Sequence, residues 1–383
     1  MRPLKVLLAC DWFAPQIGGI ESHIADLARE LHRRGHAVHV LTSTGGPAEL
    51  DGVRVHRLDV QRIPRWNVVL DPRTVRHVRA LCERERFDLV HGHSLQSPLA
   101  HVAMYAARRL LIPSVLTQHS VLGTGATRLL RGLGGPLAWA SWPTVMTAVS
   151  SVAARRASVA AGRHVHVLHT GIDLSTWSRR RSVGEGPTTV VSVTRLFAHK
   201  HTDELLHAIR RVLQLVEPAR ELRFVIVGDG PERATLERLS RRLGIASSTA
   251  FLGALPRAGV ARVLERSHVF VLPNPDEAFG IAALEARALG LPVVARAQSG
   301  ARDLIEDGRH GYLCETVDDM ALSIATLCTN AVVRHSMSRH ASEGLDAFGW
   351  GSAMARHLEI YKLAMRTKLE PALSNLQRTG SDR

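Results

Sequence analysis

The sequence predicts an α/β protein made of two domains, each with parallel strands that alternate with helices. Its 383 residues exceed what a single hydrophobic core usually holds. Apolar runs of strand length recur along the chain, and a loop and then a helical segment follow most of them. This order occurs in two similar halves, which is typical of two sheets with helices on their faces.

The composition narrows the classes of protein that fit. Hydrophobic residues make up 45% and charged residues 22%, as in ordinary globular proteins. Lys and Arg exceed Asp and Glu by 14 charges, which fits a nucleic acid, an anionic membrane surface, or only an arginine-rich composition on solvated helices. Aromatic residues make up only 4%, and no nucleic-acid-binding pattern occurs. We therefore expect contact with an anionic membrane surface and no nucleic acid.

Cysteine use and the first residues indicate the compartment. The four cysteines lie far apart without a C-x-x-C pair, which fits a reducing cytosol and argues against a disulfide framework or a zinc site. The apolar run after Met1 is too short for an export signal. We expect a cytoplasmic protein, with any membrane contact on the inner face. Residues 132–154 lack charge, but their prolines and glycines predict core and a surface loop rather than a membrane span.

The first domain begins with a predicted strand, Lys5–Cys10, and a loop that ends in Gly18 and Gly19. A helix is expected from about Glu21 to Arg34, followed by a strand at Ala37–Thr42. Two glycines at a strand-to-helix turn let the backbone approach a ligand closely. The G-x-G-x-x-G pattern is absent, and no acid ends the second strand, so a dinucleotide-dependent dehydrogenase is disfavoured.

Two later strands of this domain end in histidine. They are predicted at Asp88–His93 and Ser114–Ser120, so that His93 and His119 lie at the ligand-facing ends of parallel strands. We interpret His91, inside the first of them, as a structural residue. Residues 124–137 are basic, apolar and rich in glycine, which fits either a segment that rests on lipid headgroups or an acceptor-side loop without lipid contact.

The second domain is predicted to start at Thr188 with a strand that ends in Arg195. Lys200 follows five residues later, before the next helix. Two cations on a strand-end loop fit either a solvated rim or a diphosphate clamp. Residues 223–230 form the next strand and its turn, and Pro231 is expected to open a helix.

A strand, loop, helix and strand follow within residues 268–297. The loop places Gly280 at the N-terminus of a short helix, predicted at residues 279–289, where backbone amides and the helix dipole favour a phosphate. Glu277 and Glu285 flank this turn. Carboxylates repel phosphate but accept hydrogen bonds from sugar hydroxyls, so the pattern suits a nucleotide-sugar. Two solvated acids on a buried helix fit the spacing equally well.

The spacing Glu277-x7-Glu285 with Phe279-Gly280 between resembles the retaining glycosyltransferases of family 4. Further matches to that family are the Gly-Gly-x-Glu box at residues 18–21, the Arg-Leu-x-x-x-Lys box at 195–200 and Gly-Asp-Gly-Pro at 228–231. Ala278 and His201 stand where the family usually has glycine. The resemblance covers nearly the whole chain.

The resemblance implies the GT-B fold, in which two Rossmann-like domains face each other across a cleft and a C-terminal helix crosses back to the first domain. It implies an acceptor-side domain at residues 1–177 with 350–383, a linker at 178–187 and a nucleotide-sugar-binding domain at 188–349. It assigns catalytic roles to Arg195, Lys200, Glu277 and His119. It assigns donor binding to Gly19, Phe279, Gly280, Ile281 and Glu285.

The implied reaction moves a hexose from a nucleotide-sugar to a hydroxyl with retention of configuration. Arg195 and Lys200 would stabilise charge on the departing diphosphate, Glu285 would hold the ribose, and Glu277 and His119 the hexose. No D-x-D motif occurs, so neither a metal ion nor another cofactor is expected.

Residues 87–123 resemble more narrowly the catalytic subunit that transfers N-acetylglucosamine to phosphatidylinositol, through His-Gly-His-Ser at 91–94 and Thr-x-His-Ser at 117–120. That likeness implies UDP-GlcNAc as donor and an inositol lipid as acceptor. A soluble metabolite or a polysaccharide would fit the transferase motifs equally well, and a GDP-sugar donor stays open. The rival interpretations are a sugar-nucleotide epimerase of the same fold, and a basic membrane- or nucleic-acid-binding protein with a relict site.

Overall fold

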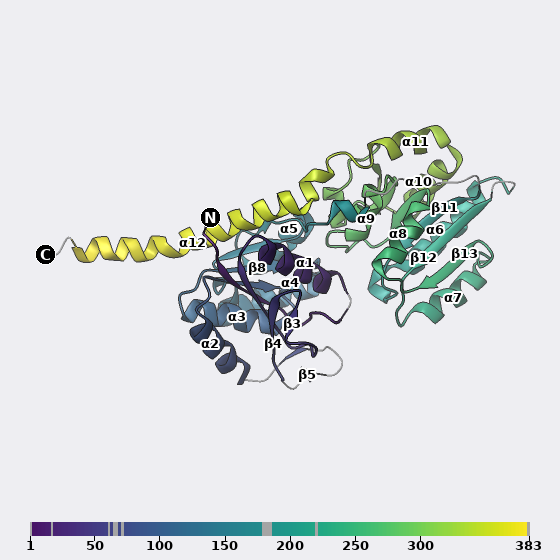
Figure 1. Cartoon of the computed structure of the whole chain (residues 1–383). Helices are drawn as coiled ribbons and strands as arrows, with labels where there is room; N and C mark the ends of the chain where they lie inside the picture. Colours follow the sequence, from purple (N-terminus) through teal and green to yellow (C-terminus); the bar gives the residue numbers. More distant parts are fainter. Residues whose placement is uncertain are drawn as a thin grey trace. The chain divides into compact units, whose positions relative to one another are not determined.

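The computed structural model describes residues 2–16, 18–59, 62–63, 68–69, 73–177, 186–218 and 221–380. It separates into unit 1, Met1–Gly171 with Trp350–Arg383, and unit 2, Ile172–Gly349. Each unit has its own mainly parallel sheet with helices on its faces (Figure 1). Of the linker expected at 178–187, all but the last two residues lie outside the described residues.

Unit 1 is built on an eight-stranded sheet with the order β10-β9-β8-β7-β1-β2-β4-β3, parallel except for the β3–β4 pair. Its strands are β1 (Lys5–Ala9), β2 (Ala37–Thr42), β3 (Glu49–Leu50), β4 (Val53–Arg57), β7 (Leu89–His93), β8 (Ser114–Gln118), β9 (Val145–Ala148) and β10 (His166–Val167). A separate antiparallel pair is formed by β5 (Arg62–Ile63) and β6 (Val68–Val69). The helices are α1 (Gly19–Arg33), α2 (Arg73–Glu85), α3 (Pro98–Arg109), α4 (Thr124–Leu137), the 3-10 helix η1 (Trp139–Ser141), α5 (Ser151–Ala161) and α12 (Trp350–Gly380).

The first strand shows why this sheet is buried on both faces. Side chains alternate between the faces of a strand, and in β1 both sets are apolar. Leu7 and Ala9 belong to a core with α2, α3 and α5, whereas Val6 and Leu8 belong to a second core with α1 and α12. The sequence of a strand that is covered on both faces is a continuous apolar run, and this run made β1 predictable.

The last helix completes unit 1. Trp350, Ala353, Met354, Tyr361 and Ala364 of α12 are buried in the second core of this unit, and α12 packs against α1, β8 and β9. Residues spaced by three, four or seven positions lie on one face of a helix, and most of these buried residues have such spacings. The C-terminal helix therefore returns to the first unit, as expected, and it extends to Gly380 (Figure 1).

Unit 2 is built on a six-stranded parallel sheet with the order β13-β12-β11-β14-β15-β16. Its strands are β11 (Thr188–Val193), β12 (Leu222–Val227), β13 (Thr249–Gly253), β14 (Val269–Leu272), β15 (Val293–Arg296) and β16 (Gly311–Cys314). Its helices are α6 (Thr202–Leu215), α7 (Arg233–Arg242), α8 (Arg257–Glu265), α9 (Ile281–Ala288), α10 (Val317–Thr329), α11 (Ala331–His340) and the 3-10 helices η2 (Leu174–Trp177), η3 (Ala198–Lys200), η4 (Gly300–Asp303) and η5 (Leu345–Phe348).

One predicted helix start is wrong. Pro231 does not open α7, which begins at Arg233 after Glu232 as its cap residue. Pro231 instead belongs to the turn that follows β12, and that turn is held by a hydrogen bond from the Glu232 amide to the Leu196 carbonyl, 3.0 Å long. The tertiary contact delays the helix by two residues.

Both parallel sheets change the direction of their connections at one strand. In unit 1 the strand β1 lies between β2 and β7, and in unit 2 the strand β11 lies between β12 and β14. Ligands of open α/β sheets bind at such a point, beyond the carboxyl ends of the strands. The loops after β1 and β7, and after β11 and β14, are therefore the places to look for function.

Residues 132–154 form the end of α4, η1, β9 and the start of α5, so this uncharged stretch is not one helix. Across the described residues, no helix combines the length and apolar character that crossing a membrane requires. Residues 124–137 are a helix rather than a loop.

Candidate active site

Two strand-end loops of unit 2 bring a cation and a carboxylate together. Lys200 ends the short helix η3 after β11, and Glu277 lies in the loop between β14 and α9. The Lys200 ammonium donates to Oε2 of Glu277 at 2.9 Å, and both side chains are about one-fifth exposed, at 18% and 20%. Asn274 Nδ2 lies 3.5 Å from the same carboxylate oxygen. The sequence-predicted residues Lys200 and Glu277 are thus direct neighbours.

The turn after β12 holds the loop that carries the cations. A Cβ on Gly228 would lie 1.8 Å from the Thr194 carbonyl oxygen, and one on Gly230 would lie 2.4 Å from the Leu196 carbonyl oxygen. Only glycine allows this close backbone approach. The Leu196 amide donates to the Asp229 carbonyl at 2.9 Å. The Gly-Asp-Gly-Pro sequence therefore acts as a structural support for the loop.

Arg195, on the same loop, is exposed, and its guanidinium lies over the Phe197 ring at 5.4 Å from the centroid. The structure therefore places its charge beside an aromatic face rather than in the Lys200–Glu277 ion pair. An exposed arginine on such a loop can turn toward an anion without losing a buried contact.

Gly280 shapes the turn into α9. Its φ of +92° is in the left-handed region, and a Cβ there would lie 3.1 Å from Cδ2 of Leu272. The first amide groups of a helix have no acceptor within the helix, and α9 has no acidic residue in its first turn. Phe279, which is buried, packs against Phe348 with the ring centroids 6.0 Å apart. This helix N-terminus suits a phosphate.

Glu285 lies on α9, one turn from Ile281, and is 13% exposed. Its Oε1 is 3.9 Å from Nη2 of Arg257, and the Arg257 guanidinium lies 5.3 Å from the centroid of the Trp177 ring. Sequence reasoning did not identify Arg257, because it is the first residue of α8 and has no neighbouring pattern. The structure places it within ion-pair distance of the Glu285 carboxylate.

In unit 1, the loop after β1 leads into α1 at Gly19. Within the described part of unit 1, a Cβ on Gly19 would meet no atom within 4 Å, so the start of α1 is open there. A Cβ on Gly18 would lie 2.2 Å from Oε2 of Glu21. Gly18 therefore lets the Glu21 side chain fold back over the helix start, while Gly19 leaves room in front of it.

Asp11, directly after β1, is a buried carboxylate that sequence reasoning missed. It accepts hydrogen bonds from Ser97 Oγ at 2.5 Å and from the Leu99 amide at 3.1 Å. Ser97 caps α3. Asp11 therefore ties the end of β1 to the start of the helix that follows β7, at the point where the sheet changes direction.

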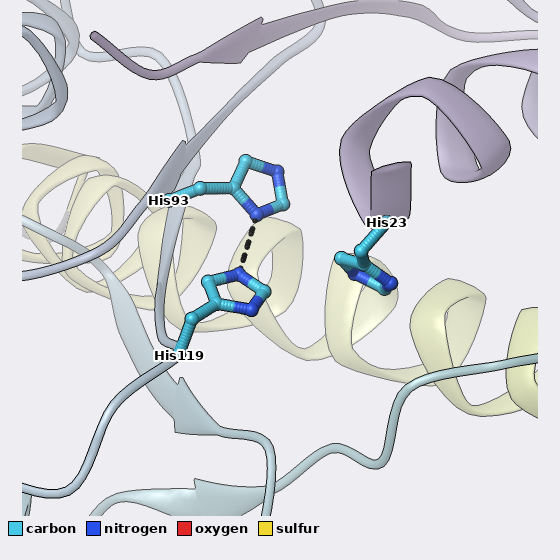
Figure 2. A group of neighbouring side chains, drawn as sticks. All are labelled: His23, His93 and His119. Atoms are coloured by element: carbon cyan, nitrogen blue, oxygen red, sulfur yellow. Dashed lines mark hydrogen bonds between the residues drawn. The ribbon is translucent and has the colours of Figure 1, made fainter. Parts of the chain in front are cut away.

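His119 lies at the carboxyl end of β8, beside His93 at the end of β7 (Figure 2). Nδ1 of His93 and Nε2 of His119 are 3.0 Å apart, which is a hydrogen bond. His23 of α1 faces this pair, with its ring centroid 5.1 Å from that of His119. Burial lowers the pKa of His119 to about 3, and it holds the pKa values of His23 and His93 well below their ordinary range. The imidazoles are therefore neutral at neutral pH.

His91 supports this group from behind. Its Nδ1 is 2.9 Å from the Tyr361 hydroxyl and its Nε2 is 2.7 Å from Thr117 Oγ1. Both nitrogens are satisfied and the ring is fully buried, so the predicted structural role of His91 is confirmed. His357 of α12, whose pKa burial lowers to about 4, also faces His23. Only the fold brings α1 and α12 to these strand ends. The one sequence signal for His23 is its place in the first turn after Gly19.

The arrangement in unit 2 has the parts that a nucleotide-sugar needs. It offers a helix N-terminus and the cations Lys200 and Arg195, which can bind phosphates, and the carboxylates Glu277 and Glu285, which can accept hydrogen bonds from hydroxyls. Ala278, where a glycine was expected, is not among the residues with positive φ, so an alanine fits its backbone.

Comparison with known proteins agrees with this geometry. The model described as "Glycosyltransferase Family 4" matches residues 17–176, and the model described as "Glycosyl transferases group 1" matches residues 175–343. The chain is 28% identical to a phosphatidylinositol N-acetylglucosaminyltransferase protein of Arabidopsis thaliana, an alignment that covers 98% of this chain and 85% of the other.

It is also 32% identical to a GDP-mannose-dependent alpha-mannosyltransferase of Mycobacterium tuberculosis, over 82% of this chain and 84% of that protein. Among solved structures, the protein HepE of Anabaena, crystallised with UDP and glucose, superposes with a TM-score of 0.75. That superposition covers 94% of this chain and 99% of the other, with 19% sequence identity.

Proposed function

The chain belongs to the family 4 glycosyltransferases of the GT-B fold, and from that premise we propose that it transfers a hexose from a UDP-sugar to phosphatidylinositol with retention of configuration. That it is a glycosyltransferase acting on a nucleotide-sugar follows from the family. The observation that carries the proposal is the Lys200–Glu277 contact of 2.9 Å beside the N-terminus of α9. It brings together a side chain proposed to bind the diphosphate and a side chain proposed to bind the sugar.

Each residue has a defined task in this proposal. Lys200, with Arg195 turned inward from Phe197, neutralises the charge that grows on the departing diphosphate. Phe279, Gly280 and Ile281 form the start of α9, and the free backbone amides there bind the same diphosphate. Glu277 accepts hydrogen bonds from the hexose.

Glu285, oriented by Arg257, accepts hydrogen bonds from the ribose hydroxyls. In unit 1, we propose that His119 contacts the hexose and that the open start of α1 at Gly19 admits a phosphate. The residues supply binding and charge, so no protein carboxylate is assigned as a nucleophile.

A relative named for phosphatidylinositol and N-acetylglucosamine, aligned over 98% of this chain, supports UDP-GlcNAc as the donor and the inositol lipid as the acceptor. The relative with 32% identity is named for GDP-mannose and makes mannosyl transfer the second candidate. The two candidates differ in the nucleobase and in the hexose, so donor binding distinguishes them.

A thermal-shift panel of UDP-GlcNAc, UDP-glucose, GDP-mannose, UDP and GDP tests the donor, with and without magnesium. A ligand at a hundred times its dissociation constant stabilises the protein by about 2.7 kcal/mol. We expect UDP-GlcNAc to give the largest shift, unchanged by magnesium. A largest shift with GDP-mannose would favour the second candidate, and no shift with any donor would contradict nucleotide-sugar binding.

Helix α4 supports contact with a membrane surface. Leu129 and Leu133 are 64% and 37% exposed on it, and Arg128 and Arg131 lie beside them in the sequence of the same helix. Exposed leucines next to arginines suit the interface of an anionic bilayer.

Flotation with phosphatidylinositol-containing vesicles tests this contact. We expect Leu129→Glu to reduce the bound fraction several-fold. The matched control is Leu111→Glu, because Leu111 is 72% exposed elsewhere on unit 1. Equal losses in both variants would contradict a specific role for α4.

A further inference from the structure

Three histidines of unit 1 form a group with the geometry of a metal site. His23, His93 and His119 each offer a ring nitrogen, and these three atoms all lie within 4.8 Å of one another. They come from three elements, the N-terminal part of α1 and the carboxyl ends of β7 and β8 (Figure 2). Among the described residues, this is the group of histidine, cysteine and acidic side chains that is close enough to hold an ion.

Two of these rings carry a buried nitrogen without a hydrogen-bond partner in the described part of the chain. They are Nδ1 of His23 and Nε2 of His93, in side chains that are 4% and 0% exposed. A buried polar atom without a partner costs free energy. A ring flip or a small rotation that offers such a nitrogen to a ligand would recover that cost.

The chemical nature of the three ligands limits which metal ions can bind. Burial keeps the pKa values of these histidines low, so each offers the lone pair of a neutral imidazole, which is the form that binds metals. Three imidazole nitrogens suit zinc, cobalt, nickel or copper, whereas magnesium and calcium prefer oxygen. Zn–N bonds of about 2.0–2.1 Å in a tetrahedral site require nitrogens about 3.3 Å apart. Nδ1 of His93 and Nε2 of His119 are 3.0 Å apart, so these two nitrogens need to separate only slightly while His23 moves toward them. Coordination through the unpartnered Nε2 of His93 instead requires a flip of that ring.

The neighbouring rings keep two of the ligands in place. His91 stacks on His93 with the centroids 4.2 Å apart, and Trp350 stacks on His23 at 5.9 Å with an interplanar angle of 17°. His91 is itself fixed by Tyr361 and Thr117. Ligands that are held before the ion arrives lose less conformational entropy when they bind it.

From these observations we propose that His23, His93 and His119 bind one divalent transition-metal ion of the zinc class, with a fourth coordination position open. The absence of paired cysteines argues against a zinc site only for sites built on thiolates. This site uses none, and its ligands are far apart in the sequence. Because His119 is also the residue proposed to contact the hexose, a bound ion withdraws it and inhibits transfer. This consequence alone rests on the proposed function.

The test uses full-length protein without a histidine tag, stripped with a chelator and titrated with Co²⁺. We expect saturation at one ion per chain, with the visible absorption bands of a four-coordinate ion that Zn²⁺ abolishes. His23→Gln and His119→Gln should each weaken Co²⁺ binding by more than about 100-fold, since even loss of a supporting contact costs 10–100-fold.

His56→Gln is the matched control, because His56 belongs to a hydrogen-bonded imidazole pair outside the proposed site, with Nε2 of His56 2.9 Å from Nδ1 of His39. The His56→Gln variant should bind Co²⁺ as tightly as the unchanged protein does. Circular dichroism without metal checks that each variant is folded. The site is refuted if the unchanged protein shows no saturable binding, or if folded His23→Gln and His119→Gln bind Co²⁺ as tightly as the control.

Transfer measured with and without one equivalent of Zn²⁺ tests the inhibition separately. Loss of activity that a chelator reverses supports it. Full activity of zinc-loaded enzyme would refute the inhibition and leave the binding site standing.

Discussion

At the scale of single residues, Lys200 and Glu277 form an ion pair whose members have different tasks in the proposed reaction. The pair is partly exposed on both sides, and such pairs contribute about 0–1 kcal/mol to stability. A diphosphate is a stronger partner for the ammonium than a carboxylate shared with a sugar. Donor binding should therefore separate the pair and leave each member with its own part of the ligand.

Replacing Lys200 should affect the reaction far more than the fold. We expect Lys200→Ala to lower kcat by at least about 100-fold, the effect of removing one group that stabilises transition-state charge. The Tm should change little, because the ion pair contributes little. The control is Lys362→Ala, an exposed lysine of α12. Near-normal turnover by Lys200→Ala would remove this residue from the mechanism.

A second pair of imidazoles should make stability depend on pH. Burial lowers the pKa of His39 to about 4 and holds that of His56 below its ordinary value. The charges that act on the pair are Lys5, Arg54, Arg84 and Glu85. Between about pH 4 and 6.5 the unfolded chain binds protons that the folded chain does not. Stability therefore falls as the pH drops through this window, by up to about 1.4 kcal/mol per pH unit for each such histidine.

Urea unfolding at several pH values checks this. His39→Gln should lose less stability between pH 7 and pH 5 than the unchanged protein does. His207→Gln, on an exposed position of α6, should keep the original dependence. The same slope in both variants would show that His39 is not the group responsible.

At the scale of elements, the turn into α9 requires glycine at position 280 but accepts Ala278, where the family usually has glycine. Gly280 has a positive φ and little space around its Cα, whereas Ala278 is not in the left-handed region. The amides that follow Gly280 are positioned by this turn. Its geometry therefore connects the packing of β14 to the proposed phosphate site.

Exchanging the two residue types tests that connection. Gly280→Ala should destabilise the protein by about 1–2 kcal/mol, the cost of a left-handed conformation with a Cβ, and should abolish the thermal shift caused by the donor. Ala278→Gly should cost under about 1 kcal/mol and preserve the shift. A preserved shift in Gly280→Ala would contradict a phosphate at this helix start.

Much of the fold was predictable at this scale, because strands buried on both faces are unbroken apolar runs. The strand predicted at Ala37–Thr42 coincides with β2, and the helix predicted at residues 279–289 differs from α9 by two residues at its start and one at its end. The start of α7 was wrong because the contact with Leu196, far away in the sequence, decides it. Local patterns do not contain that information.

Some residues of the candidate site could be predicted from the sequence and others could not. Lys200 and Glu277 could be paired because parallel strands bring their carboxyl ends to one edge, while Arg257 and Asp11 stand in no recognisable pattern. His93 and His119 were expected at the ends of parallel strands, but His23 could not be added to them, because that requires knowing that α1 covers this face of the sheet. The roles of all these residues in the reaction stay predictions.

At the scale of the whole molecule, the two units differ in how the chain builds them. Unit 2 is one continuous segment, whereas unit 1 uses both ends of the chain. The buried face of α12 contributes Trp350, Met354 and Tyr361 to the core over β1. Burying a large apolar side chain is worth about 1.5–3 kcal/mol, so losing three removes much of the roughly 5–15 kcal/mol by which a protein is stable.

Two fragments test this difference. Residues 172–349 should fold alone, with a cooperative thermal transition. Residues 2–171 should fail to give one, and adding a peptide of residues 350–367 should restore it. Cooperative folding of residues 2–171 without the peptide would contradict an essential role for α12.

The return of α12 to unit 1 also sets an order of events on the ribosome. All strands of unit 1 are synthesised before unit 2 begins, yet the helix that covers one face of their sheet emerges after unit 2 ends. At about 5–20 residues per second, translation of unit 2 takes roughly 10–35 s. Throughout that interval the nascent sheet exposes apolar side chains, so unit 1 should depend on a chaperone during synthesis, and unit 2 should be the first to become resistant to protease.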